Sequence, residues 1–427
     1  MSMPVGQSLY QSIPYVEDIN DYRAGGFHPV HLGDLLDCGR YRIINKLGYG
    51  TFSTVWLAED LIIKTCVAIA IQKAEHTLSD LGTHNITILH HLSQDNPLSP
   101  GRTRVLLPLR EFRLYGPNGT HFCVVSEIQG PSLSTVTKRK LRPPSELLPL
   151  FKAKRAAHDL IMAFDFIHDQ GVVHGGMMNS QPDIPLAKNY TIDLHPGNIL
   201  MSLPKDDPWT AEYMESALGQ PRTVPVKRVD GRPLEENVPR YGVEEALGRL
   251  SDMSTYYGAA KLSDFGCAFF ANDPPEEIDY FGPYVVPEQY CTGRIGFPMD
   301  IWTLGCAIFL LLSGHDFFGI PDQSTGKTFS IMTDVLGVPP EDMFRVWNQK
   351  VNQDLQISSK PSRPLSLQIR ELKDGNPDLK MKCRQHEISD DDISLLTSFL
   401  QSMVVYEPEK RLTIAEVLKH PAMAFFV

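Results

Sequence analysis

The hydrophobic residues change their spacing along this chain, and this change constrains the fold more than any other feature. The first third contains short β-branched and aromatic runs at 41–47, 55–58 and 67–71, which predict strands. Between 157 and 167 apolar residues recur every three or four positions, and 299–312 is almost wholly apolar, which predicts helices. We therefore expect an α+β fold with two lobes, a small β-rich one followed by a larger helical one, with a cleft between them.

The same patterns divide the chain into segments. We expect an N-terminal arm at 1–36, a small lobe at 37–127 and a large lobe at 128–427. Two stretches, 176–192 and 201–260, show neither period, and the second is polar and contains Pro and Gly. We predict that both are insertions and that the second is a loop.

Smaller elements are also predicted. The small lobe should contain a short helix at 86–92 and strands at 104–107 and 122–125. The large lobe should contain a helix at 393–403, capped by Ser389 or Asp390.

Composition restricts the environment and the partners. The seven cysteines are scattered without a CxxC pair, which fits reduced thiols in the cytoplasm or nucleus rather than disulfides or a zinc site. The N-terminus lacks an apolar signal core, and the run at 301–312 is too short to cross a bilayer, so no membrane association is expected. The net charge of −11 argues against non-specific nucleic-acid binding and is compatible with a basic partner, but from charge alone a merely soluble acidic protein is the better explanation. We expect a monomer that does not bind nucleic acid directly.

Three short motifs carry the chemistry, and the first is Leu47-Gly-Tyr-Gly-Thr-Phe-Ser-Thr-Val55. Gly48 and Gly50 let backbone N–H groups approach phosphates closely, and Val55 would cover a purine base. Taken alone, this string fits a glycine hairpin without a ligand just as well.

The other two motifs are Asp193-Leu-His-Pro-Gly-Asn198 and Lys261-Leu-Ser-Asp264-Phe-Gly266. An Asp with an Asn five residues later fits a base for a substrate hydroxyl together with a metal ligand. An Asp on a glycine turn after a strand fits a second ligand of Mg²⁺. Each string alone could be a chance turn, but their order after the glycine motif makes chance a poor explanation.

In this order the motifs resemble those of eukaryotic-type protein kinases, and the resemblance extends from about residue 21 to residue 420. Further similarity lies at Val286-Pro-Glu288, at Asp300-Ile-Trp-Thr-Leu-Gly-Cys306 and at Arg411. The resemblance implies Mg²⁺-ATP at the lobe interface, Asp193 as the group that orients or deprotonates the substrate hydroxyl, and Asn198 and Asp264 as metal ligands. It also implies a buried pair between Glu288 and Arg411, and a nucleotide site formed by Leu47, Gly48, Gly50, Val55, Ala68, Glu127 and Ile128.

Within that superfamily the chain is most similar to the SR-protein kinases. The arm sequence Asp21-Tyr-Arg-Ala-Gly-Gly-Phe-His-Pro-Val-His-Leu-Gly-Asp34 resembles the entry arm of that group, and Phe52-Ser-Thr-Val-Trp-Leu-Ala58 resembles its glycine-turn strand. The activation segment at 264–288 is similarly short. This implies transfer of the ATP γ-phosphoryl group to serine in basic, Arg-Ser-rich proteins, a substrate class that suits the acidic chain.

Two positions depart from the family pattern. Ala70 stands where the family has the lysine that clamps the α- and β-phosphates, and Asn85 stands where it has the glutamate that pairs with that lysine. Lys73 follows three residues later and should point to the opposite face of the strand, as a solvated lysine. Because loss of one partner would leave an unpaired charge, the joint loss indicates relaxed or redirected function.

The catalytic motif departs as well. His195 occupies the place of a lysine that contacts the transferred phosphate; we count it as a candidate catalytic residue, although a neutral imidazole supplies less charge. Residues 176–192 separate His174 and Gly175 from Asp193, which the family keeps two residues from the histidine. Two hypotheses stay open: a translated intron, or a genuine inserted loop that disturbs positioning.

Two other functions also stay open. Ala70, Asn85 and the interrupted motif are compatible with a catalytically impaired pseudokinase that acts as a binding or scaffold module. His174-Gly175 followed by the Asp193 motif also resembles aminoglycoside and choline phosphotransferases, which act on small molecules. The motifs at Glu288, Trp302 and Arg411 favour the protein kinases over these small-molecule enzymes.

Overall fold

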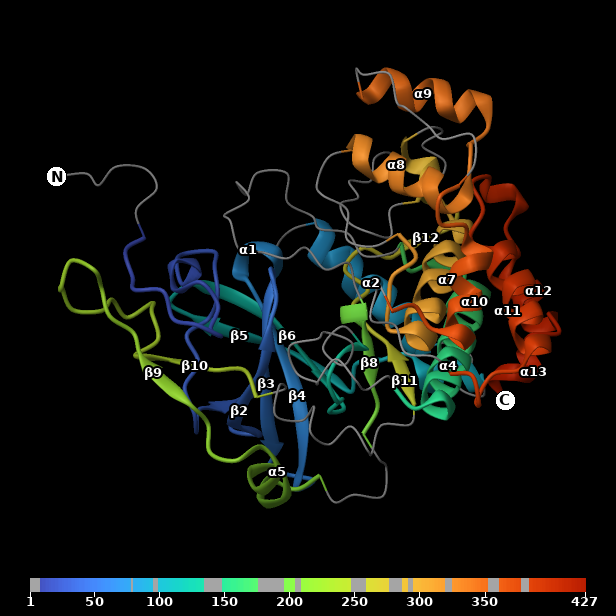
Figure 1. Ribbon diagram of the computed structural model, residues 1–427. Helices are drawn as coiled ribbons and strands as arrows, with labels where there is room; N and C mark the ends of the chain where they lie inside the picture. The colour runs from blue at the N-terminus through green and yellow to red at the C-terminus, as the bar shows by residue number, and fades with distance from the viewer. Residues whose placement is uncertain are drawn as a thin grey trace. The chain divides into compact units, whose positions relative to one another are not determined.

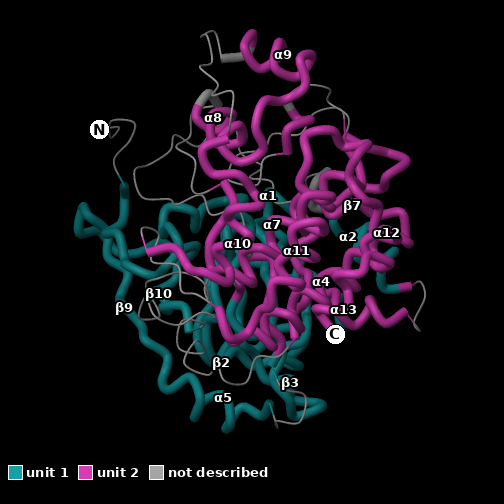
Figure 2. Tube along the Cα trace, turned by 45° about the vertical axis from the view of Figure 1, so that its right-hand side comes forward, with its two compact units in different colours: residues 1–93, 106–131, 203–257 teal, residues 94–105, 132–202, 258–427 magenta. Residues whose placement is uncertain are grey.

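The computed structural model describes residues 8–77, 80–94, 99–133, 148–175, 196–203, 209–246, 259–275, 286–290, 295–318, 325–351, 361–377 and 384–427. The chain divides into two compact units, shown in Figure 2. Unit 1 comprises 1–93, 106–131 and 203–257, and unit 2 comprises 94–105, 132–202 and 258–427. Unit 1 contains most of the strands and unit 2 most of the helices, so the predicted α+β class is confirmed.

Unit 1 is built on a six-stranded antiparallel sheet with the order β1-β2-β3-β4-β6-β5 (Figure 1). Successive side chains of its central strands point to opposite faces of the sheet. Every second side chain of β4 (Val67, Ile69 and Ile71) therefore enters one buried apolar cluster with Trp56. The strands are β1 (Leu35–Leu36), β2 (Tyr41–Tyr49), β3 (Ser53–Asp60), β4 (Thr65–Gln72), β5 (Arg110–Gly116) and β6 (Gly119–Ser126).

Two helices follow β4 in the chain: α1 (Ala74–Thr77) and α2 (Asp80–Gln94). The predicted helix at 86–92 lies within α2, and the predicted strand at 122–125 lies within β6. The predicted strand at 104–107 is wrong. A 3₁₀ turn occupies Pro100–Arg104, and only an isolated bridge follows at Val105.

The segment predicted as a loop at 201–260 contains regular structure. Its described part, 209–246, includes α5 (Ala211–Leu218) and a small hairpin of β9 (Thr223–Pro225) and β10 (Tyr241–Val243). Two of its apolar side chains, Val226 and Val238, complete a second buried cluster with six residues of the arm: Tyr10, Ile13, Val16, Ile19, Tyr22 and Phe27. Neither the arm nor the insertion could bury these side chains alone, which explains why neither shows a clear period in the sequence.

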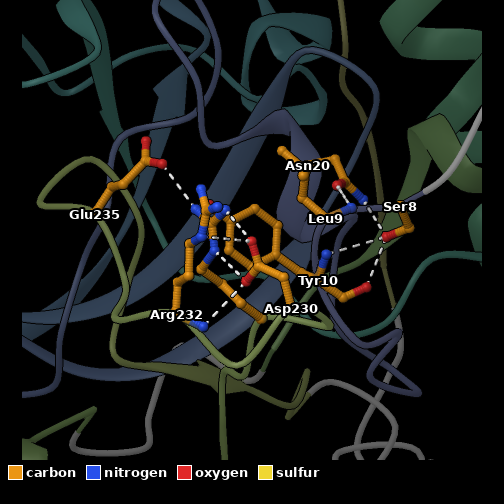
Figure 3. Close-up of polar contacts among 8 residues, drawn as sticks. Ser8, Leu9, Tyr10, Asn20, Asp230, Arg232 and Glu235 are labelled. Carbon is orange, nitrogen blue, oxygen red and sulfur yellow. Dashed lines mark hydrogen bonds and ion pairs between the residues drawn. The ribbon is translucent and has the colours of Figure 1, made fainter. Parts of the chain in front are cut away.

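Backbone hydrogen bonds join the same two segments, and Figure 3 shows polar contacts within each of them. The backbone of the arm bonds that of the insertion, with Val229 N donating to Leu9 O at 2.9 Å. The side chain of Arg228 is only 8% exposed; it donates to Asp230 at 2.7 Å and to Glu235 at 2.8 Å, and its guanidinium carbon lies 5.9 Å from the centre of the Tyr10 ring. The arm and the insertion therefore form one packed structure in unit 1.

Unit 2 is mainly helical. The long helix α7 (Phe297–Ser313) is buried from Met299 to its end, and α4 (Leu150–Asp169) packs against it. The predicted helices at 299–312 and 393–403 lie within α7 and α11, and Ser389 caps α11 through a reciprocal pair of hydrogen bonds with Asp392. The remaining elements are β7 (Val172–Val173), β8 (Ile199–Met201), β11 (Ala260–Leu262), β12 (Phe269–Phe270), α8 (Thr325–Leu336), α9 (Glu341–Val351), α10 (Leu365–Asp374), α11 (Asp390–Met403), α12 (Ile414–Lys419) and α13 (Met423–Phe426).

A search of the described residues for helices that combine the length and apolarity needed to cross a bilayer found none.

Candidate active site

One face of the unit 1 sheet collects the residues predicted to contact a nucleotide. Gly48 pairs with Val55, Val55 pairs with Ala70, and Ala68 pairs with Ser126. Because paired residues and alternate residues of a strand share a face, Val55, Ala68 and Ala70 lie together, opposite the buried cluster. This face offers small apolar side chains of the kind that a flat base packs against.

The other predicted nucleotide contacts flank this face. Leu47 is buried at the end of β2, and Gly50 closes the turn to β3 by donating its N–H to Ser53 O at 2.8 Å. Glu127 and Ile128 follow β6 directly, and Ile128 is 7% exposed. The structure therefore brings these positions to the strands that the sequence indicated, while their role in binding stays a prediction.

Ala70 leaves the sheet face without the expected cation, and Lys73 does not replace it. The Lys73 ammonium donates to Asp21 of the arm at 3.0 Å and lies 4.5 Å from the centre of the Phe27 ring. The expectation of a solvated lysine is wrong, because the side chain is only 8% exposed. The lysine is buried among residues of the arm, on the side of the sheet away from Ala70.

Lys46, the other buried lysine of this sheet, is also directed toward the arm. It forms an ion pair with Glu17 and lies 5.4 Å from the centre of the Trp56 ring, which belongs to the buried cluster. Burial lowers the pKa of Lys46 to about 7, while the nearby Glu245 carboxylate opposes that shift. Two arm carboxylates, those of Glu17 and Asp21, thus hold the two buried lysines on the opposite face.

Asn85 lies in α2, and its side-chain oxygen is buried without a hydrogen-bond partner among the described residues. An amide oxygen in this state needs a donor, because an unsatisfied buried acceptor costs roughly 1–3 kcal/mol. Asn85 and Ala70 are therefore uncharged at the two positions where the resemblance implied an ion pair.

The predicted metal ligands of unit 2 lie at the same end of two paired strands. Leu262 of β11 pairs with Ile199 of β8, so Asn198 and Asp264 directly flank that ladder. Ser263 ties the two together by donating its N–H and its hydroxyl to Asn198 O, both at 2.9 Å. Asp264 has a φ of 62°, a left-handed conformation that is costly for a residue with a side chain and is typical of functional turns.

These two residues fit a magnesium ion. Mg²⁺ prefers oxygen ligands and keeps several waters or phosphate oxygens, so one carboxylate and one amide oxygen are a plausible protein share. No group of three or more His, Cys, Asp or Glu side chains within the described ranges is placed to hold a metal. A bound Mg²⁺ would neutralise charge on the phosphates, and Asn198 and Asp264 would hold it.

The segment at His174 and Gly175, where the resemblance places the start of the catalytic loop, is fixed by Asp300 of α7. Its carboxylate accepts the backbone N–H of His174 at 2.8 Å, that of Gly175 at 3.1 Å and the Nε2–H of His168 at 2.9 Å. The His174 ring in turn donates to Ser263 O at 3.2 Å and packs edge-on against Phe265. These bonds connect the loop to the segment that carries Asp264.

Asp193 and His195 lie outside the described residues, and so does the predicted insertion at 176–192. Their predicted roles stay predictions.

The predicted pair between Glu288 and Arg411 is confirmed. Arg411 donates to both carboxylate oxygens at 2.7 Å, and both side chains are fully buried. Its guanidinium also donates to Pro298 O at 2.9 Å and lies 4.9 Å from the centre of the Trp302 ring. A bidentate buried pair with its other donors satisfied holds a fold together rather than performing chemistry.

Comparison with known proteins agrees with this geometry. The protein kinase domain family matches residues 251–423. Over this range the chain is similar to protein kinases. The matched range, 251–423, includes Asp264 and both residues of the Glu288–Arg411 pair.

The chain is also similar to three curated proteins. The serine/threonine-protein kinase SRPK of Physarum polycephalum is 25% identical over 431 residues, which cover 96% of this chain and 91% of the relative. SKY1 of Saccharomyces cerevisiae is 31% identical over 191 residues, 44% of this chain and 23% of that protein. Human SRSF protein kinase 3 is 34% identical over 152 residues, 36% of this chain and 26% of that protein. The chain thus aligns with about a quarter of the length of the last two.

We predict that Arg411→Gln lowers the free energy of unfolding of unit 2 by about 3–5 kcal/mol, because Glu288 is left as an unpaired buried charge. Lys410→Gln is the matched control, since its neighbouring ion pair with Glu407 has a 63% exposed ammonium and should change stability by less than about 1 kcal/mol. Chemical denaturation of both variants measures the difference. Equal effects would show that the buried pair does not stabilise the fold in this way.

Proposed function

We propose that this chain transfers the γ-phosphoryl group of Mg²⁺-ATP to serine side chains of basic, Arg-Ser-rich proteins. The observation that carries the proposal is the fixed end of β8 and β11, where Asn198 and Asp264 are held together by Ser263. Phosphoryl transfer depends mainly on positioning and charge stabilisation, and such a rigid pair of oxygen ligands supplies both.

The remaining parts of the reaction are assigned to other residues of the chain. Asp193 would orient the serine hydroxyl or accept its proton, and His195 would lie beside the transferred group. Val55 and Ala68 would pack against the base, with Gly48 and Gly50 giving backbone N–H groups access to the phosphates. His174 and Asp300 fix the entry to the loop that carries Asp193.

The substrate class is supported by the relatives and by charge. The relatives carry the names serine/threonine-protein kinase SRPK and SRSF protein kinase 3, and this chain has a net charge of −11. An acidic surface attracts a basic chain and repels an acidic one.

We predict that the full chain phosphorylates an Arg-Ser repeat peptide in saturating Mg²⁺-ATP, and that Asp193→Ala reduces the rate at least about a hundredfold, as expected for loss of a positioned general base. The control peptide has each Ser replaced by Ala, and incorporation of ³²P into peptide is the measurement. A folded chain that labels neither peptide would contradict the proposal, and so would labelling that survives in Asp193→Ala.

A second function, a catalytically impaired pseudokinase that serves as a binding module, is favoured by one feature of unit 1. Ala70 and Asn85 are neutral, and the two buried lysines, Lys46 and Lys73, are paired with carboxylates of the arm. A nucleotide bound to this sheet would therefore lack the cation that normally fixes its α- and β-phosphates, and phosphoryl transfer would be slow.

If that missing ion pair limits catalysis, Ala70→Lys combined with Asn85→Glu should raise the rate of peptide phosphorylation at least about tenfold. The matched control is Ala70→Met with Asn85→Gln, which introduces similar volumes without charge. A gain in the charged pair alone supports the explanation. Equal rates in both double variants would show that Ala70 and Asn85 are not the positions that limit the reaction.

A further inference from the structure

The segment between β4 and α2 is held on both sides by distant parts of unit 1. On one side, Lys73 N donates to Phe52 O at 2.8 Å, and the Phe52 ring stacks on His76 with centroids 4.7 Å apart. Phe52 belongs to the glycine turn, so the segment 73–77 supports the turn that the proposed function places over the phosphates.

On the other side, the arm satisfies the first backbone donors of α1. Ala74 N donates to Gly26 O at 3.1 Å, and Glu75 N donates to Gly25 O at 2.7 Å. The first N–H groups of a helix have no partner within the helix, so these arm carbonyls replace a cap. The Lys73–Asp21 ion pair closes the same contact, with the lysine 8% exposed.

The two glycines of the arm are required by this geometry. Gly25 has a φ of +84°, which L-residues rarely adopt. A Cβ on Gly26 would lie 1.8 Å from Asp21 O, so no side chain fits there without displacing the arm. The Gly-Gly pair therefore permits the close approach of the arm to α1.

The same part of the arm is also anchored to the turn between β5 and β6. The backbone carbonyl of Asn118, in the turn between β5 and β6, accepts a hydrogen bond from Gly25 N at 2.8 Å. The side-chain amide of Asn118 donates to Phe27 O at 2.6 Å and to Asn237 O at 2.9 Å. Asn237 of the insertion donates to Tyr22 O at 3.1 Å. A continuous series of bonds thus runs from the insertion through the arm to 73–77 and the glycine turn.

We propose that Lys73 and Asp21 are positioning residues, which hold the glycine turn in place for nucleotide binding in a chain that lacks the usual lysine–glutamate pair. Lys73 acts through the segment 73–77 and not by contact with phosphate. The inference rests on the proposed function only for the measurement of nucleotide binding. The effect of Lys73 on the glycine turn can be measured without any ligand.

The test compares Lys73→Met with Arg23→Gln in the full chain. Lys73→Met removes the ion pair of the buried Lys73 side chain with Asp21, whose side chain is 37% exposed, and keeps the length of the side chain. Arg23→Gln removes an ion pair of the same arm with Glu75, in which the side chains are 55% and 43% exposed, and it serves as the control. Backbone hydrogen exchange is measured without ligand, and the Kd for Mg²⁺-ADP is measured by calorimetry.

We expect Lys73→Met to accelerate exchange at 74–75 and at 50–53 by about tenfold, with β5 and β6 unchanged, because this ion pair, in which the lysine is buried, restrains only the local segment. The Kd for Mg²⁺-ADP should rise by a similar factor, and Arg23→Gln should change both by less than about twofold. Exchanging the charges, with Asp21→Lys and Lys73→Asp together, should recover part of the loss.

Two results would overturn the proposal. One is unchanged exchange in the glycine turn of Lys73→Met. The other is faster exchange across the whole sheet, which would make the pair a general stabiliser without a positioning role. If the unsubstituted chain does not bind Mg²⁺-ADP, the nucleotide part of the proposed function fails, while the exchange measurement still decides whether the arm positions the turn.

Discussion

The buried carboxylate of Asp300 is the interaction on which the candidate catalytic machinery depends. It accepts three donors from two other segments: the His168 ring of α4 and the backbone of His174 and Gly175. Hydrogen bonds to a charged acceptor contribute roughly 1.5–3 kcal/mol each, and a buried carboxylate without them would be costly. Through His174 and Ser263 this network reaches Asn198 and Asp264, so the positions of the two candidate metal ligands depend on α7.

Unit 1 is organised differently. Its two buried sheet lysines are bound to carboxylates of the arm, and the arm is packed against the insertion in a separate apolar cluster. The arm therefore contributes both charge partners and helix-capping carbonyls to the sheet and to α1. In this chain the two buried lysines bind carboxylates of the arm, and the positions of Ala68 and Ala70 on the opposite face carry no charge.

The fold and the site motifs could largely be predicted because they depend on local patterns. Period-two runs gave β2, β3 and β4, the three-to-four spacing gave α4, and the glycine turn and Asp264 were found from short strings. The segment 209–246 could not be predicted, because its apolar residues are buried against segments distant in the chain: Val226 and Val238 against the arm, and Val243 in the cluster of the sheet. The burial of Lys73 was missed for the same reason: its partner Asp21 is 52 residues away and has no sequence signal of pairing. The strand expected at 104–107 failed because Pro100 and Gly101 start a 3₁₀ turn there.

We propose that Asn198 and Asp264 of unit 2 hold Mg²⁺ and that unit 1 lacks the cation that would bind the phosphates. Calorimetric titration of the full chain with ATP, in Mg²⁺ and in a chelator, tests this most directly. We expect binding to be at least about tenfold tighter with Mg²⁺, because the metal supplies nearly all the positive charge on the phosphates, and we expect Asp264→Asn to abolish that difference. Equal affinity with and without Mg²⁺ in the unsubstituted chain would contradict the account, since a cation of the protein itself would then be neutralising the phosphates.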